Sequence, residues 1–339
     1  MVRPKVYVTR RILSPGLEII SEYCDYEIWP DVDYPPPRAV LLEKVRDKDG
    51  LLCLLTDKVD AEVMDAAPNL KVISTYSVGY DHIDVVAATE RGIYVCYTPG
   101  VLTNATADFA WTLMLAAARR ICEADRYVKE GRWDKPWNPF MLLGVDVYGK
   151  TLGIIGLGRI GRAVAERAKG FDMKVIYYDV YRIPPDEEAK LGVEYRSLED
   201  VLRSADFVSI HVPLTKDTYH LIGERELRMM KPTAILINTS RGPVVDEKAL
   251  YIALRERWIR AAGIDVWEQE PTPKDNPLLT LDNLVAAPHI ASASEEARSS
   301  MAEMAAKNLI AVLKGEMPPA LANPDVLKIR PLDKVKMMV

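Results

Sequence analysis

The glycine-rich segment at residues 156–161, Gly-Leu-Gly-Arg-Ile-Gly, constrains the fold of this chain more than any other sequence feature. It follows a short apolar run and opens a helical pattern, and this context makes the spacing informative. Gly156 permits a tight turn, Gly158 lets a pyrophosphate approach the backbone, and Gly161 lets the helix pack closely on the strand. The helix N-terminus offers free N–H groups and a partial positive charge to the phosphates. The segment therefore predicts a strand–turn–helix unit that binds a dinucleotide.

Asp179 ends the next strand-like run. It lies near the place, about 20 residues after the last glycine, where a ribose-binding carboxylate is expected. A carboxylate there accepts hydrogen bonds from the hydroxyls of the adenosine ribose and repels a 2′-phosphate, so NAD(H) is the preferred cofactor. The nearby Arg182 keeps NADP(H) possible. The alternative interpretation is that Asp179 merely ends the strand.

Strand-like and helix-like segments alternate along the 339 residues, first over residues 5–96 and again from residue 151 onward. This alternation predicts parallel strands joined by crossover helices, in two successive α/β blocks. Between the blocks, residues 104–131 form one long helical pattern whose first half is apolar nearly all round. Such a helix is buried on more than one side, either in the core of the chain or against a second copy, and a homodimer contact is favoured. Residues 131–143, rich in Trp and Pro, are predicted to be an irregular loop.

Composition argues against several classes of protein. The 44 basic and 49 acidic residues give a net charge of −5, which disfavours a nucleic-acid binder. The longest apolar stretch, residues 109–118, is too short to cross a bilayer, and the N-terminus lacks the pattern of a secretory signal, so a cytoplasmic protein is expected. The four cysteines form no Cys-x-x-Cys pair, and no metal site is expected. A single Gln and 23 Pro are typical of a thermophile.

Three segments of the second block place charged residues just after apolar, strand-like runs. Arg241, the pair Glu268 and Glu270, and His289 each follow one such run. Ligands bind at the carboxyl ends of the strands in open α/β sheets. Each residue alone has an ordinary reading, as a surface arginine, a solvated loop carboxylate or a buried histidine. Together, behind a dinucleotide motif, they form a complete set for the reduction of a 2-keto acid.

The chemistry of that reduction explains the set. A fixed guanidinium, here Arg241, holds a substrate carboxylate through two hydrogen bonds. An acid delivers a proton to the carbonyl oxygen as hydride reaches the carbon, and histidine suits this task because its unperturbed pKa is about 6.5. A neighbouring carboxylate raises the pKa of an imidazole and keeps the imidazolium populated near neutrality. The residues therefore predict an oxidoreductase.

Motifs along nearly the whole chain resemble the D-isomer-specific 2-hydroxyacid dehydrogenase family. The matching stretches are VGYDHID (78–84), RGIYVCYTPGVLTNATAD (91–108), WNPFMLLGVDVYGKTLGIIGLGRIG (137–161), HVPLTKDTYHLIG (211–223), INTSRGPVVDEKAL (237–250), GIDVWEQEP (263–271) and APHIASAS (287–294). So many motifs in order are specific for the family, and within it the chain is most similar to archaeal glyoxylate reductases. The motifs are less specific for the substrate.

The resemblance implies a role for each site residue. His289 is the acid/base, Arg241 binds the substrate carboxylate and carbonyl, and Glu270 is the partner carboxylate because it directly precedes a proline. Asp265 orients the nicotinamide carboxamide. Further substrate contacts are implied at Leu54, at the backbone of Val78 and Gly79, and, from the other subunit of a dimer, at Trp137. Motif and resemblance together give cofactor contacts at Thr106, Gly156, Gly158, Arg159, Ile160, Gly161, Asp179, Arg182, Val212, Pro213, Thr218, Thr239, Ser240, Arg241, Asp265, His289, Ala291 and Ser292.

The family fold divides the chain differently from the two successive blocks. It implies that residues 1–100 and 291–339 form a flavodoxin-like substrate-binding domain and residues 101–290 a Rossmann NAD-binding domain. Both are doubly wound parallel-sheet α/β domains, with the active site in the cleft between them, where closure excludes water. The expected activity is NADH-dependent reduction of glyoxylate and hydroxypyruvate to glycolate and D-glycerate, in a homodimer.

Two departures from the family pattern and several alternatives bear on this expectation. Ala291 stands where the family usually has Gly, which adds a methyl group beside the nicotinamide. Asp179 stands where several close relatives carry a Ser-Arg-Thr segment suited to a 2′-phosphate, and this favours NADH. The alternatives are a short 3-phosphoglycerate, D-lactate or phosphite dehydrogenase, or an NAD(H)-sensing protein like the corepressors built on this fold. Residues 53–56 and 76–81 contain no Arg or Lys to meet a substrate phosphate.

Overall fold

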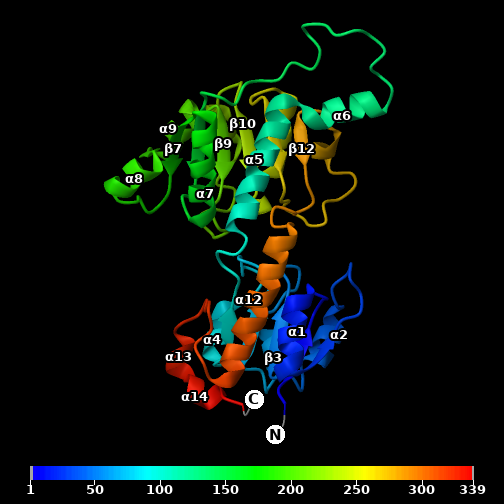
Figure 1. The fold of residues 1–339 in the computed structure, drawn as a ribbon, viewed down its shortest axis with the longest axis vertical. Coiled ribbons are helices and arrows are strands. Elements are labelled where there is room, and N and C mark those ends of the chain that lie inside the picture. Colours follow the sequence, from blue (N-terminus) through cyan, green and yellow to red (C-terminus); the bar gives the residue numbers. More distant parts are fainter. Residues whose placement is uncertain (1–2, 338–339) are drawn as a thin grey trace. The chain divides into compact units, whose positions relative to one another are not determined.

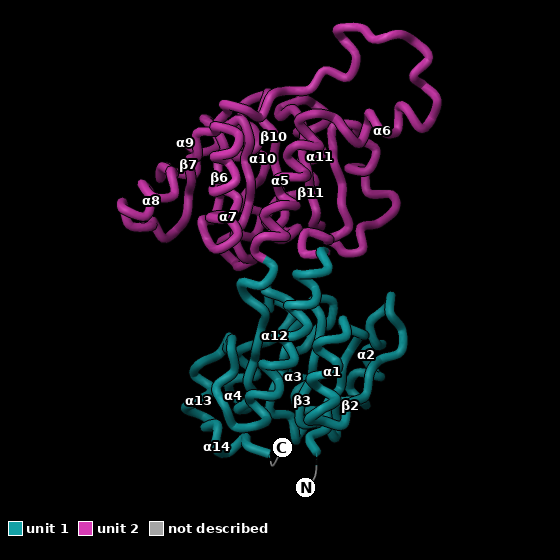
Figure 2. Tube along the Cα trace, viewed as in Figure 1, with its two compact units in different colours: residues 1–102, 294–339 teal, residues 103–293 magenta. Residues whose placement is uncertain are grey.

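The chain folds into two compact units, each built on one parallel sheet. The computed structural model describes residues 3–337. Unit 1 comprises residues 1–102 and 294–339, and unit 2 comprises residues 103–293 (Figure 2). The predicted fold class, two doubly wound parallel-sheet α/β domains, is confirmed. The division implied by the family fold, after residues 100 and 290, differs from these bounds by a few residues.

The sheet of unit 1 has the strand order β2-β1-β3-β4-β5, and neighbouring strands are parallel. Its strands are β1 (Lys5–Val8), β2 (Asp25–Ile28), β3 (Gly50–Cys53), β4 (Val72–Thr75) and β5 (Tyr94–Cys96). Every residue of β3 and β4 is buried, as expected for parallel strands covered on both faces. Leu54 directly follows β3, and Val78 and Gly79 follow β4, so these residues lie at the carboxyl ends of two adjacent strands.

The last long helix of the chain belongs to unit 1. The helices of this unit are α1 (Ser14–Tyr23), α2 (Arg38–Lys44), α3 (Ala61–Asp65), α4 (Val85–Glu90), α12 (Glu295–Lys314), α13 (Val326–Ile329) and α14 (Leu332–Val335). α12 packs against α1 and lies on β3 and β4 (Figure 1). A Cβ on Gly16 would lie 2.6 Å from the carbonyl oxygen of Ala302, so the absence of a side chain on α1 permits this close contact. The predicted tail after α12 contains the two short helices α13 and α14.

The sheet of unit 2 has the strand order β12-β11-β10-β9-β6-β7-β8, again parallel throughout. Its strands are β6 (Thr151–Ile155), β7 (Lys174–Tyr178), β8 (Val193–Tyr195), β9 (Phe207–Ile210), β10 (Ile235–Asn238), β11 (Ala261–Ile264) and β12 (Leu284–Ala286). The order runs outward from β6 to β8 and then continues from β9 on the other side of β6. This is the switch point at which doubly wound sheets bind nucleotides, at the carboxyl ends of the strands.

The helices of unit 2 are α5 (Thr103–Arg119), α6 (Ile121–Lys129), α7 (Arg159–Ala168), α8 (Pro185–Leu191), α9 (Leu198–Ser204), α10 (Glu224–Met229) and α11 (Glu247–Arg255). One core cluster joins α5 and α7 to the sheet, and a second joins α9, α10 and α11 to it. No helix within residues 3–337 combines the length and apolar character that a membrane-spanning helix needs.

The prediction of one continuous helix over residues 104–131 is wrong. Arg120 adopts a left-handed backbone conformation with φ +54°, which ends α5 and starts the separate helix α6. Most apolar residues of α5 are buried inside unit 2, as the core alternative expects, and the favoured dimer contact through this helix stays a prediction. Trp111 illustrates the packing, because its ring stacks on Phe171 and its Nε1–H donates to the carbonyl of Val164 at 3.1 Å.

Candidate active site

The glycine-rich segment forms the predicted strand–turn–helix, between β6 and α7. Gly156 has φ +93°, and a Cβ there would lie 2.8 Å from the backbone of His211, which follows β9. A Cβ on Gly161 would lie 2.2 Å from the carbonyl oxygen of Gly156, so only glycine lets α7 approach the turn. A Cβ on Gly158 would meet no atom within 4 Å. The loop therefore closes tightly at its ends and leaves open space over its middle, which fits a pyrophosphate.

The N-terminus of α7 is also left for a ligand. Gly158 is the N-cap residue, and no side chain caps the helix. The backbone N–H groups of Arg159 and Ile160, in the first turn, have no helical acceptor, as in every α-helix. Together with the helix dipole they suit an anion. Thr239, after β10, adds a buried hydroxyl oxygen for which the described residues provide no hydrogen-bond partner. These features fit the cofactor that the sequence predicts.

Asp179 lies against the glycine loop at the end of β7. Its Oδ2 accepts a hydrogen bond from the N–H of Leu157 at 2.7 Å, and its Oδ1 accepts one from the N–H of Tyr181 at 3.0 Å. Each oxygen keeps a further lone pair that a ribose hydroxyl can use. Arg182 is turned to another partner, because Nε and Nη2 donate to the two carboxylate oxygens of Glu188 at 2.8 and 2.9 Å.

His289 and Glu270 form a hydrogen-bonded pair. Nδ1 of His289 lies 2.7 Å from Oε2 of Glu270, and the other carboxylate oxygen accepts from the N–H of Trp267 at 3.0 Å. Burial raises the pKa of Glu270, but the hydrogen bond and charge of His289, the Trp267 N–H and the charge of Arg241 outweigh burial and leave that pKa below its usual value. Because Nδ1 faces the carboxylate, Nε2 is the imidazole nitrogen left for a substrate.

Arg241 is brought to this pair by a close contact between two loops. The residue follows β10, and Nδ2 of Asn238 donates to its carbonyl oxygen at 3.0 Å. A Cβ on the next residue, Gly242, would lie 1.9 Å from the carbonyl carbon of Trp267. The Arg241 loop therefore touches the loop that carries Glu270, and its charge contributes to the low pKa of that carboxyl. Arg241, Glu270 and His289 thus follow three neighbouring strands, β10, β11 and β12, at the carboxyl edge of the unit 2 sheet.

Asp265 builds the turn that carries His289. Its carboxylate accepts hydrogen bonds from the N–H groups of Ile290 and Ala291, both at 2.8 Å, and its carbonyl accepts one from the N–H of His289 at 2.7 Å. These bonds hold His289 at φ +58°, a conformation that residues other than glycine seldom adopt. Burial raises the pKa of Asp265, although the two N–H groups partly oppose this effect. This structural task is not visible in the sequence, because the partners are 25 and 26 residues away.

The other histidines of unit 2 differ from His289. Burial lowers the pKa of His211 to about 4, so it is neutral near pH 7 and does not suit a proton donor. His220 has Nε2 2.9 Å from Oε1 of Glu268 and Nδ1 3.8 Å from Oδ2 of Asp246. One possible metal-ligand atom from each of His220, Asp246 and Glu268 lies within 4.8 Å of the other two, a spacing that could also hold a metal ion. Both carboxylates already accept backbone hydrogen bonds at α11, so the cluster ties the loop before α10 to the loop after β11.

The remaining predicted residues fall into three places. Val212, Pro213, Thr218 and Ser240 follow β9 and β10, and the Thr218 hydroxyl donates to the carbonyl of Pro213 at 2.6 Å. Thr106 is buried on α5, Ala291 is buried in the His289 turn, and Ser292 follows it. Trp137 lies on the loop after α6, and 79% of its surface is exposed in the single chain.

Unit 1 contains a support for Leu54 that sequence reasoning missed. Asp57, only 3% exposed, accepts hydrogen bonds from the Leu54 N–H at 2.7 Å and from the Thr9 hydroxyl. The carboxylate therefore fixes the loop after β3. In the loop after β4, the Ser77 hydroxyl donates to the carbonyl of Gly79 at 2.7 Å. Each loop expected to meet the substrate is thus held by a neighbouring polar side chain.

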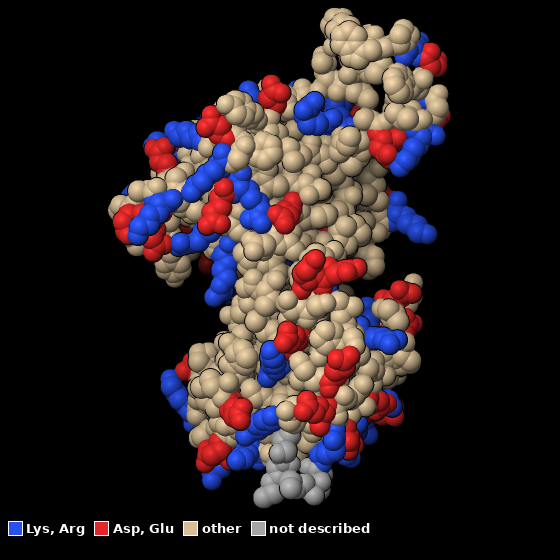
Figure 3. Space-filling view, in the orientation of Figure 1, with Lys and Arg blue, Asp and Glu red and all other residues tan. Residues whose placement is uncertain are grey.

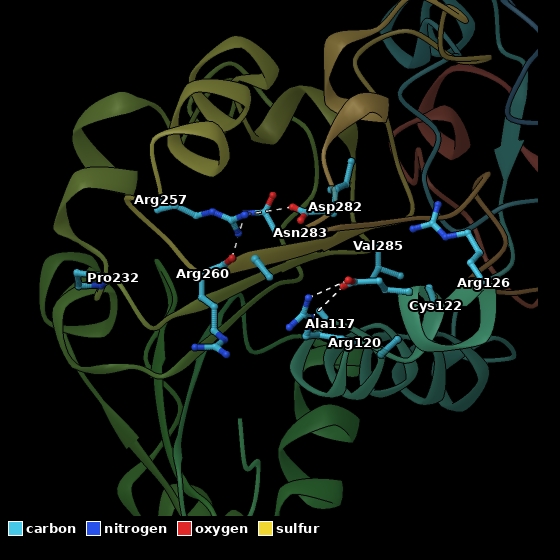
Figure 4. Close-up of a pocket in the computed structure, with 14 residues that line it drawn as sticks. Ala117, Arg120, Cys122, Arg126, Pro232, Arg257, Arg260, Asp282, Asn283 and Val285 are labelled. Carbon is cyan, nitrogen blue, oxygen red and sulfur yellow. Dashed lines mark hydrogen bonds and ion pairs between the residues drawn. The ribbon is translucent and has the colours of Figure 1, made fainter. Parts of the chain in front are cut away.

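A pocket of about 360 Å³ lies elsewhere in unit 2, where α5 meets α6 and the amino ends of β11 and β12 (Figure 4). Two of its arginines are paired inside it, Arg120 with Glu123 at 2.8 Å and Arg257 with Asp282 at 3.1 Å. None of the predicted site residues lines it. Because nucleotides bind at the opposite, carboxyl end of parallel strands, this pocket is separate from the cofactor site.

Fold and site together define a dinucleotide-dependent oxidoreductase. Residues 111–291 match the NAD-binding domain of the D-isomer-specific 2-hydroxyacid dehydrogenases. The chain belongs to this family, and unit 2 contains its NAD-binding domain.

Similar proteins agree with this assignment over the whole length. A glyoxylate reductase from Thermofilum pendens is 62% identical over 338 residues, covering 100% of both chains. The solved structure of a Thermus thermophilus protein is 46% identical, with a TM-score of 0.88 over 94% of this chain and 99% of that one. An NADPH-dependent glyoxylate/hydroxypyruvate reductase from Sinorhizobium meliloti, solved with NADP and malonate, is 32% identical, with a TM-score of 0.84 over 96% of this chain and 98% of that one.

Proposed function

We propose that this chain is an NADH-dependent glyoxylate reductase that also reduces hydroxypyruvate. The observation that carries the proposal is the His289–Glu270 pair, 2.7 Å apart, beside the charge of Arg241 in a domain with an open glycine loop. The relatives support the choice of substrate, because the curated protein from Thermofilum pendens is named a glyoxylate reductase.

The proposed roles follow from the geometry. Bound NADH would supply the hydride that reaches the keto carbon. Arg241 binds the substrate carboxylate, which fixes the 2-keto group and turns it toward His289. The imidazolium donates the proton on Nε2 to the carbonyl oxygen, and Glu270 holds the Nδ1–H so that the ring keeps this orientation. Carbon thus gains a hydride and oxygen a proton, which balances the conversion of glyoxylate to glycolate.

The substrate contacts proposed in unit 1 are Leu54 and the backbone of Val78 and Gly79. These residues lie at the carboxyl ends of β3 and β4, where open α/β sheets bind ligands. The absence of Arg and Lys from residues 53–56 and 76–81 favours a small, singly charged keto acid over a phosphorylated one. Glyoxylate fits this description.

NADH rather than NADPH is the proposed cofactor. Asp179 would accept hydrogen bonds from the ribose hydroxyls, and its charge would repel a 2′-phosphate. Its contact with the N–H of Leu157, at 2.7 Å, supports this role because it sets the carboxylate beside the loop that would hold the pyrophosphate.

The proposal includes a cytoplasmic homodimer formed through α6 and the loop that follows it, which we call the arm (residues 121–148). α6 has no buried residue, and Trp137 and Phe140 further along the arm are 79% and 81% exposed. Much of the arm's surface is uncharged in Figure 3. A groove lies between α6 and the segment around β12, and among the described residues Asp125 and Arg126 of α6 are its only charged lining. Its apolar lining comes from Ile121, Ala124, Val128, Leu278, Leu279, Leu281, Leu284, Val285 and Ala286. A second copy can cover both surfaces symmetrically, since each copy offers an arm and a groove. Trp137 would then reach the partner's pocket.

A rate matrix tests the proposed reaction. Purified protein is mixed with NADH or NADPH and with glyoxylate, hydroxypyruvate, pyruvate or 3-phosphohydroxypyruvate, and cofactor oxidation is followed by absorbance. The highest kcat/KM is expected for glyoxylate with NADH. Turnover of pyruvate or a bulkier keto acid without turnover of glyoxylate would overturn the substrate assignment.

A further inference from the structure

The basic residues near the proposed ribose site are held by two consecutive glutamates of α8. Figure 1 shows α8 at the edge of unit 2, beyond β7. Glu188 accepts two hydrogen bonds from Arg182, at 2.8 and 2.9 Å, and Glu187 forms an ion pair with Arg162 of α7 at 2.7 Å. Both arginines lie close in sequence to residues that touch the glycine loop. An arginine near the ribose carboxylate is the usual partner of a 2′-phosphate in NADP-binding domains.

The contact between Arg182 and Glu188 is the better built of the two. The Glu188 side chain is only 11% exposed, and its Oε1 also accepts from the buried Tyr177 hydroxyl at 2.8 Å. The same hydroxyl accepts from the N–H of Ile183 at 3.1 Å, which fixes the backbone directly after Arg182. The guanidinium also lies 5.3 Å from the ring centre of Tyr195. Both ends of the ion pair are therefore held in place, and Nε and Nη2 are occupied.

We propose that Glu188 is a specificity-determining residue that withholds Arg182 from the 2′-phosphate of NADP(H). The inference rests on the proposed NADH preference and assigns it to two devices. Asp179 repels the phosphate, and Glu188 removes the cation that would otherwise attract it. The Arg182 guanidinium must break its hydrogen bonds to the Glu188 carboxylate before the same N–H groups can bind a phosphate. Charge-assisted hydrogen bonds of this kind are among the strong ones in proteins.

Equilibrium binding of NADPH and NADH, measured by calorimetry on the full chain, tests the proposal without relying on turnover. Glu188→Gln keeps the size of the side chain and an oxygen for Tyr177, but it removes the charge that holds Arg182. This variant is expected to tighten NADPH binding by about tenfold and to leave NADH binding unchanged. In the Arg182→Leu background, Glu188→Gln is expected to have no effect on NADPH binding.

Glu187→Gln is the matched control, since it makes the same charge change one residue away on the same helix. Arg162 remains bound to the glycine loop, because its Nε donates to the carbonyl of Leu157 at 3.3 Å. The control is therefore expected to change NADPH affinity much less than Glu188→Gln does. If both variants gained the same NADPH affinity, the change in net charge alone would explain the effect, and this result would contradict the proposal.

Two further outcomes would overturn the proposal. One is an unchanged ratio of NADPH to NADH affinity in a folded Glu188→Gln protein, and the other is a gain that persists without Arg182. Glu188→Asp, which shortens the side chain and misaligns the fork, provides a second variant if Glu188→Gln does not fold. NADH-driven reduction of glyoxylate by the wild type is measured separately, so a failure of the proposed function can be distinguished from a failure of the proposed role of Glu188.

Discussion

The imidazole of His289 and the carboxylate of Glu270 meet through Nδ1 and Oε2 at 2.7 Å, although the two residues are 19 positions apart in the chain. Two loops after neighbouring strands of one sheet bring them together, and Asp265 fixes the backbone of the histidine. The pair orients the ring and leaves Nε2 for the proposed proton transfer.

Glu270→Gln is expected to lower kcat for glyoxylate reduction by about 10- to 100-fold, because the neutral amide no longer stabilises the imidazolium. Steady-state rates with glyoxylate and NADH measure the effect. An unchanged kcat would show that Glu270 does not influence the proposed proton donor.

The same pair makes a contribution to stability that depends on pH. The pKa of Glu270 is lowered in the folded chain, so the folded state binds this proton less tightly than the unfolded state. The stabilisation is present above the usual glutamate pKa of about 4.3 and is lost as the pH falls through the lowered value. The Tm of the wild type minus the Tm of Glu270→Gln should therefore become smaller as the pH is lowered. Thermal unfolding followed by circular dichroism measures this difference. A Tm difference that does not vary with pH would contradict this linkage.

Gly242→Ala tests the loop contact that places Arg241. A Cβ at residue 242 would lie 1.9 Å from the carbonyl carbon of Trp267, so backbone must move. The variant should lower kcat/KM by at least about tenfold and destabilise the fold by about 1–3 kcal/mol. Gly170→Ala is the control, since a Cβ there meets nothing within 4 Å. Equal stability and kinetics for the two variants would remove the steric explanation.

Asp179→Asn should weaken NADH binding and reduce the difference in affinity between NADH and NADPH. The amide cannot accept at both positions, where the N–H groups of Leu157 and Tyr181 already require two acceptors. A loss of about tenfold in NADH affinity is expected from one charge-assisted hydrogen bond. Calorimetric titration of the variant measures it. An unaltered NADH affinity would show that Asp179 ends the strand but does not bind the ribose.

Val128→Asp tests the arm as a dimer contact. Val128 lies on α6 and is 54% exposed in the single chain. A charge there should convert the proposed dimer to a monomer, as measured by light scattering after size exclusion. Val86→Asp on α4, where the native residue is 70% exposed, is the control and should leave the mass unchanged. A wild-type monomer, or a dimer that survives the arm variant, would exclude this interface.

Local sequence patterns predicted the parts of the fold that depend on near neighbours. The strand–turn–helix around Gly156 and the strand end at Asp179 follow from spacing alone, and both occur as expected. The break at Arg120 could not be foreseen, because the residue has no sequence signature of a left-handed turn. Its position is fixed by Glu123 and by the distant carbonyl of Leu143.

Contacts between distant segments explain what sequence reasoning missed in the site. Asp57 supports Leu54, and Glu188 captures Arg182, through side-chain directions that become defined only once helices pack on the sheets. Asp265 was assigned to the cofactor, whereas its carboxylate also builds the His289 turn. The family resemblance supplied the proposed catalytic residues but not the groups that hold them.

Replacement of His289 by Asn tests the central claim most directly. Asparagine can still donate toward Glu270 but cannot transfer a proton, so kcat for glyoxylate reduction should fall by about 10²- to 10⁴-fold while NADH affinity is retained. Both quantities are measured on the same preparation, by NADH absorbance and by calorimetry. A variant that binds NADH and reduces glyoxylate at the wild-type rate would remove His289 from the chemistry and contradict the account.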